Sequence, residues 1–158
     1  LRPTDSLEVF PGPTPDADGC YLTKFFLHGI RWCPPAAIER INRLASGDRL
    51  ALMPDWMNDF DPYAVAVRTA DVRDRFMIGY VPRYLAREIL EVSIQCGPQF
   101  IDLTVERVNP GAPHQMRLLC RMNACWPEGF QPCAGDDFQP IVSPSSYTED
   151  VTRARESR

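Results

Sequence analysis

Residues 58–67, NDFDPYAVAV, join an acidic turn directly to a strongly alternating apolar segment. Asn, Asp and Pro favour turns because side-chain oxygens bond nearby backbone amides and Pro fixes φ. The preceding segment, RLALMP at 49–54, is also β-prone. The pattern therefore predicts one strand at 49–54, then the turn, and a second strand at 64–69. The turn alone has a simple structural interpretation, so a functional one needs the rest of the chain.

Further strands and two helices flank this unit. Strands are expected at 21–30, 75–81, 99–109 and 115–124, the third alternating with Ile101, Leu103 and Val105 on one side. Helical periodicity predicts helices at 36–45 and 83–94, the second starting after Pro82, which suits a first helical turn. The expected fold is mainly β with two short helices. Six short strands favour a small, partly open OB-like or SH3-like barrel.

Composition divides the 158 residues into a central domain and two tails. Residues 1–20 are rich in Pro and predict a flexible arm, and residues 126–158 predict an irregular acidic tail. Thirteen basic and eleven acidic side chains give residues 21–125 a net charge of +2, although the whole chain carries −4. Such a balance argues against a protein that grips long nucleic acids by bulk charge.

The six cysteines and the termini bear on compartment and metal binding. No apolar run is long enough to span a membrane and no signal peptide is visible, so we expect a cytoplasmic protein with reduced thiols. Cys120, Cys125 and Cys133 are spaced too loosely for a typical zinc motif. We therefore expect no metal and no cofactor, with incidental or buried cysteines as the simpler interpretation.

Three motifs together resemble the HIRAN domain family. They are GIRW at 29–32, GDRLALMPDWMNDFDPYAVAV at 47–67 and IGYVPRYLA at 78–86. The combination is specific, although no single piece is, and the likeness covers residues 21–125. The resemblance implies an OB-like barrel that binds DNA without catalysis, with a preference for the 3′ end of a single strand. No G-x-x-x-x-G-K-[ST] motif occurs in the sequence, so a helicase or nuclease partner would come from another chain.

The resemblance also assigns roles to particular residues. Arg31 and Arg83 match phosphate-binding positions, and Trp32 and Phe60 match aromatic residues that stack on bases. Asp61 matches an acceptor for the terminal 3′-hydroxyl. The full candidate set is Arg31, Trp32, Asn58, Phe60, Asp61, Tyr80 and Arg83.

Two other functions stay open at this point. A protein-interaction adaptor would use a sheet edge or Trp56 and Trp126. A metal-dependent nuclease would need a divalent cation held by Asp55, Asp59 and Asp61, but no base is obviously placed beside them.

Overall fold

The computed structural model describes residues 15–130, which form six strands and two α-helices. The predicted arm and tail fall largely on residues 1–14 and 131–158, outside the described residues. The helices are α1 Pro35–Asn42 and α2 Arg83–Gln95, and three short 3-10 turns are η2 Ile30–Trp32, η3 Pro98–Phe100 and η4 His114–Met116. The strands are β1 Cys20–Phe26, β2 Leu50–Pro54, β3 Val65–Thr69, β4 Met77–Tyr80, β5 Ile101–Val108 and β6 Leu118–Cys125.

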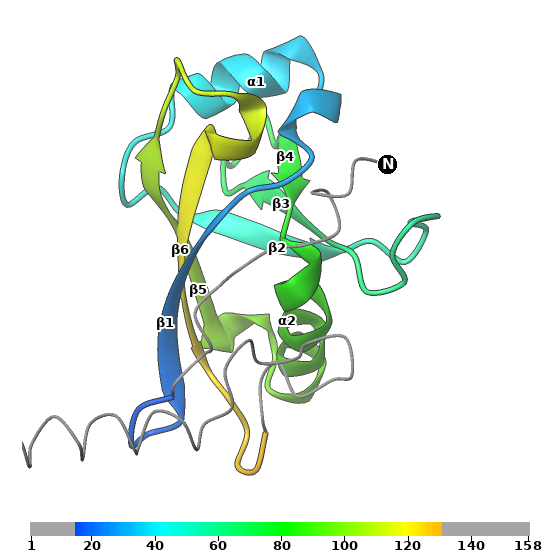
Figure 1. Cartoon of the computed structure of the whole chain (residues 1–158), viewed down its shortest axis with the longest axis vertical. Coiled ribbons are helices and arrows are strands. Elements are labelled where there is room, and N and C mark those ends of the chain that lie inside the picture. Colours follow the sequence, from blue (N-terminus) through cyan, green and yellow to red (C-terminus); the bar gives the residue numbers. More distant parts are fainter. Residues whose placement is uncertain (1–14, 131–158) are drawn as a thin grey trace, which may run out of the picture.

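The strands form two antiparallel three-stranded sheets, ordered β1-β6-β5 and β2-β3-β4 (Figure 1). Within the described residues, only the isolated bridges His28 with Tyr80 and Arg49 with Thr104 pair one sheet with the other, and no continuous ladder closes the strands into a barrel. The predicted mainly β fold with six strands, two helices and incomplete closure is thus confirmed. The OB-like description within that fold stays a prediction.

The core lies between the two sheets and the helices. Ile78 of β4 and Met122 of β6 are fully buried, as are Ile41 of α1 and Ile89 of α2, so both sheets and both helices contribute to one core. Each such side chain contributes about 1.5–3 kcal/mol of burial free energy. The alternation predicted for residues 99–109 is correct, since Ile101, Leu103 and Val105 of β5 are buried and Asp102 is exposed.

Proline sets the start of both helices. Pro35 is the first residue of α1, where a missing N–H costs nothing. Pro82 is the N-cap of α2, one position before the first turn that the sequence suggested. Neither described helix is both long enough and apolar enough to cross a membrane.

Gly79 brings β4 close to the chain that leaves β1. Its φ is +149°, and a Cβ there would lie 2.5 Å from the main-chain oxygen of His28. The next residue, Tyr80, exchanges two backbone hydrogen bonds with His28, at 2.9 and 2.8 Å. The glycine therefore fixes the position of Tyr80 beside the turn that follows His28.

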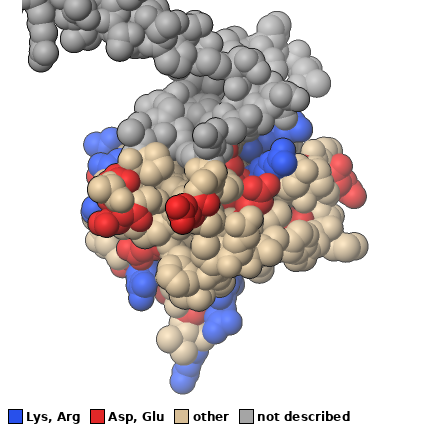
Figure 2. Space-filling model, turned by 90° about the horizontal axis from the view of Figure 1, so that it is seen from below, with Lys and Arg blue, Asp and Glu red and all other residues tan. Residues whose placement is uncertain are grey.

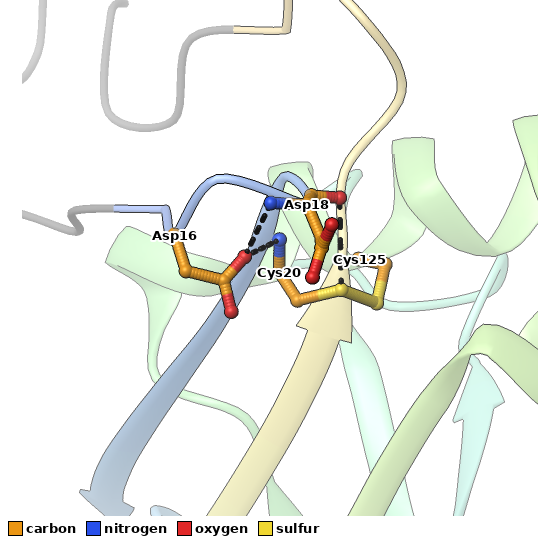
Figure 3. The surroundings of a disulfide bond; sticks show 4 residues. All are labelled: Asp16, Asp18, Cys20 and Cys125. Carbon is orange, nitrogen blue, oxygen red and sulfur yellow. Dashed lines mark hydrogen bonds between the residues drawn. A yellow bond between two sulfur atoms is a disulfide. The ribbon is translucent and has the colours of Figure 1, made fainter.

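Cys20 and Cys125 form a disulfide, so the expectation of reduced thiols is wrong for this pair (Figure 3). The two residues lie directly opposite each other where β1 and β6 pair, although 105 residues separate them in the sequence. Asp16 Oδ1 accepts the N–H groups of Asp18 and Cys20, which closes the turn before the first strand. The bond therefore fastens the first strand of the domain to the last.

The structure describes two of the three cysteines that were considered for a zinc site. Cys125 is bonded to Cys20 and is therefore not a free thiol, and burial raises the pKa of Cys120 to about 12. Cys133 lies outside the described residues.

Trp126 is only 7% exposed and stacks between Tyr21 and Phe130, with ring centroids 5.2 and 4.6 Å away. It therefore belongs to the core and is not an adaptor contact.

Candidate nucleic-acid interface

The turn after β1 presents two candidate residues, Arg31 and Trp32. Gly29 precedes it with φ +75°, a conformation that suits glycine, and Ile30 anchors the turn in the core. Trp32 is 78% exposed, and the guanidinium carbon of Arg31 lies 4.8 Å from the centroid of its ring. A cation therefore lies over an exposed aromatic ring, and such a pair has the chemistry to bind a phosphate and a base.

The loop between β2 and β3 presents three more, and Figure 1 shows it projecting from the body of the domain. Asn58 Oδ1 accepts the N–H groups of Phe60 and Asp61 at 3.0 and 3.1 Å. Asp61 Oδ1 in turn accepts the N–H of Tyr63 at 2.9 Å. These side-chain turns hold the loop in one shape, so Phe60, which is 90% exposed, is displayed rather than collapsed onto the core.

Asp55, which was named from the sequence only as a possible metal ligand, holds this loop together through its hydrogen bonds. Its Oδ2 accepts the Tyr80 hydroxyl at 2.9 Å and the Asn58 amide at 3.1 Å, and its Oδ1 accepts the Met57 N–H at 3.3 Å. These bonds to Asn58 and Tyr80 lower the pKa of Asp55. An acid three residues before an Asn, in a turn composition, was the available signal.

Tyr80 connects the loop to the turn after β1. Its hydroxyl donates a hydrogen bond to Asp55. Burial is the main cause that raises the pKa of the phenol, and the bond to Asp55 is the second. Its ring lies against Gly29, where a Cβ would be 3.2 Å from the Cδ2 atom. Tyr80 therefore lies between the segment carrying Arg31 and Trp32 and the loop carrying Phe60 and Asp61.

Arg83 is exposed at the first residue of α2, three positions after Tyr80. Within residues 15–130, Arg83 makes no hydrogen bond or ring contact with the other candidate residues. The next turn of α2 carries Arg87, whose guanidinium carbon lies 5.3 Å from the ring centroid of Tyr63 at the end of the loop. Arg87 was not among the residues predicted from the sequence, although its i, i+4 spacing from Arg83 was a signal that could have identified it.

The surface is mixed in charge. Figure 2 shows acidic and basic side chains interspersed with uncharged surface on one face, without a continuous basic track. Two hollows of about 290 and 350 Å³ lie instead against α1 and the β3–β4 connection, where Arg40 bonds Asp71 through two nitrogens. None of the candidate residues lines either hollow.

The nuclease alternative lacks its metal site in the described part of the chain. Within residues 15–130, no group of three or more His, Cys, Asp or Glu side chains is arranged to hold a metal ion. Asp55 is committed to Tyr80, Asn58 and the Met57 amide, and one oxygen of Asp61 is committed to Tyr63. Asp55 and Asp61 therefore organise this loop.

Comparison with known proteins identifies the family and supports the fold. The model of the HIRAN domain family matches residues 21–122, and DNA binding is the known role of that family. A protein from Lactobacillus plantarum has a similar structure, with a TM-score of 0.52 and 17% identity over 66% of this chain and 96% of that one. The HIRAN domain of human HLTF gives a TM-score of 0.48 and 14% identity over 68% and 80%. No significant match was found among curated proteins.

Proposed function

The chain belongs to the HIRAN domain family, and we propose that it is a non-catalytic module that binds the 3′-hydroxyl end of single-stranded DNA. The observation that carries this proposal is the display of Trp32 and Phe60, both far more exposed than aromatic side chains usually are, on two segments that meet at Tyr80. Apolar rings held in water in this way suit the faces of nucleobases, and stacking contributes about 1–3 kcal/mol per base.

Charged groups beside the rings suit the end of a strand. Arg31 offsets a phosphate next to Trp32, and Arg83 offers a second cation at the start of α2. Asp61 keeps one carboxylate oxygen that makes no recorded bond to the described residues, since its other oxygen accepts the Tyr63 N–H. A free 3′-hydroxyl donates to such an oxygen, whereas a 3′-phosphate is repelled by its charge.

The size of the charged set predicts a weak dependence on salt. Two arginine contacts release few counterions, so the logarithm of the affinity should fall with the logarithm of salt with a slope of about −1.4, or −0.7 for each phosphate. A much steeper slope would mean that the strand runs over a longer basic surface than Arg31 and Arg83 provide.

The first experiment compares linear single-stranded DNA with a circle of the same sequence. The linear strand has an end and the circle has none, and their phosphates and bases are otherwise equal. Competition against a 5′-labelled ten-nucleotide strand in fluorescence anisotropy should show the circle at least about tenfold weaker, a difference of 1.4 kcal/mol. Equal competition would leave single-strand binding without end recognition.

The proposal also covers partner and place. Unwinding or cleavage would be supplied by a helicase or nuclease on another chain, because the residues that this module displays suit binding. We place the protein in the cytoplasm. Disulfides are uncommon there, so the redox state of Cys20 and Cys125 in cells checks this location directly.

A protein-interaction adaptor is the second candidate, and Trp56 with Met57 favours it. Both side chains are exposed on the loop, at 66% and 89%. Trp56→Ala combined with Met57→Ala separates the two functions. Unchanged DNA affinity would favour a protein contact at this tip, whereas a loss would extend the DNA-binding surface onto it.

A further inference from the structure

Asp55 connects parts of the site that are far apart in the sequence. It lies 25 residues before Tyr80, yet its carboxylate takes the Tyr80 hydroxyl at 2.9 Å. Its backbone N–H donates to the carbonyl of Ala64 at 2.9 Å, and its carbonyl accepts the Asn58 N–H at 3.3 Å. One residue therefore closes the two ends of the loop and fastens the loop to β4.

The contacts of Asp55 continue to the displayed side chains. The same Oδ2 that accepts from Tyr80 accepts the Asn58 amide, and Asn58 Oδ1 then takes the N–H groups of Phe60 and Asp61. On the other side, the Tyr80 ring touches Gly29, which begins the turn carrying Trp32. A hydrogen bond from a neutral phenol to an ionised carboxylate is stronger than one between neutral groups.

We propose that Asp55 is the positioning residue of the DNA-end site, which it sets through Tyr80 and Asn58 without touching the ligand. The inference rests on the proposed function. Tyr80 was a candidate for nucleic-acid binding. In this proposal its hydroxyl instead links the loop to the turn that carries Trp32, and it does not contact DNA directly. Asn58 likewise becomes a part of the loop framework, because its amide oxygen is occupied by two backbone N–H groups.

The test is a cycle of Tyr80→Phe, Asp55→Ala and the double variant, with affinity for the ten-nucleotide strand as one readout. Tyr80→Phe should weaken binding about threefold to tenfold, the range of one ordinary hydrogen bond. Asp55→Ala should weaken it at least as much, and the double variant should equal Asp55→Ala alone. Additive losses would mean that the Tyr80 hydroxyl touches DNA itself and would overturn the proposal.

A second readout does not depend on DNA. Amide hydrogen exchange at Phe60 and Asp61 reports the bonds to Asn58, and it should accelerate in Asp55→Ala while core amides stay protected. In ¹³Cζ-tyrosine NMR spectra, Asp55→Asn should bring the pKa of Tyr80 down toward that of an ordinary tyrosine. Unchanged exchange and an unchanged Tyr80 titration would refute the positioning role.

Acid provides a third readout, and its direction follows from the lowered pKa of Asp55. The folded loop is favoured by the carboxylate, so its contribution is complete above the ordinary value of 3.8 and is lost as pH falls through the lower pKa of the folded state. Protection at Phe60 should therefore fall below about pH 4 in the parent protein. The variant Asp55→Asn should lack this transition, and the same transition in that variant would exclude Asp55 as its source.

Tyr63→Phe is the matched control, because it removes a tyrosine hydroxyl from the same loop and keeps the ring beside Arg87. It should leave affinity, exchange and acid response unchanged. Failure of the proposed function is distinguishable: the parent protein would not bind the strand at all, yet Asp55→Ala would still release the Phe60 and Asp61 amides.

Discussion

Replacing Trp32 or Phe60 by alanine is expected to abolish most of the affinity for single-stranded DNA without unfolding the domain. The two side chains are 78% and 90% exposed, so their removal takes almost nothing from the core. Stability should change by no more than about 0.5 kcal/mol, the usual limit for surface substitutions. Each lost stack costs about 1–3 kcal/mol, which corresponds to roughly a fivefold to 150-fold rise in Kd.

The assay is fluorescence anisotropy with a 5′-labelled ten-nucleotide strand at about 50 mM salt, where phosphate contacts are not strongly screened. Val72→Ala is the matched control, since Val72 is an 89% exposed apolar side chain on the separate β3–β4 connection. Trp32→Phe should recover most of the affinity because it keeps a ring. Folded alanine variants that bind as tightly as the parent protein, singly and together, would refute the stacking account.

Two further predictions concern the framework. Reduction of the Cys20–Cys125 disulfide, or the variant Cys20→Ser, should remove about 2–5 kcal/mol of stability and lower Tm by about 10 °C or more, because the bond closes a long loop; an unchanged melting curve would contradict this. Gly79→Ala should cost at least about 2 kcal/mol in chemical denaturation, since its Cβ would meet the His28 carbonyl at 2.5 Å. Gly47→Ala, also at positive φ but with nothing within 4 Å, should cost less, and equal losses would exclude the close approach as the cause.

The sequence predicted the elements wherever local periodicity decides them. Alternation identified the buried side of β5, and helical periodicity identified α2, which buries Leu85, Ile89 and Val92. The first strand was predicted to continue to residue 30 but ends at Phe26. Gly29, with φ +75°, starts a 3-10 turn there, and the β-prone residues around it gave no sign of that break.

Contacts between distant segments were beyond what the sequence could predict. The disulfide depends on the register between β1 and β6, which brings Cys20 opposite Cys125 although neither has a telling local pattern. Trp126 is buried by stacking with Tyr21 and Phe130, whereas the adaptor alternative had named it as a possible protein contact. The role of Asp55 likewise needed the position of Tyr80.

The candidate site lies between these cases. The motif correctly grouped Asn58, Phe60 and Asp61 in one loop, and the structure adds the link to Tyr80. Spacing alone did not reveal which of these side chains are free to meet a ligand. The hydrogen bonds divide them, because Asn58 and Tyr80 are engaged within the protein while Phe60 is displayed.

The most direct test of end recognition compares a 3′-hydroxyl strand with a 3′-phosphate strand in the parent protein and in Asp61→Asn. The asparagine keeps an oxygen for the Tyr63 N–H, so the loop should stay intact while the negative charge is removed. The account predicts that the parent protein prefers the hydroxyl end at least about tenfold, and that Asp61→Asn loses most of that preference. Equal affinity of the parent protein for both ends would contradict it.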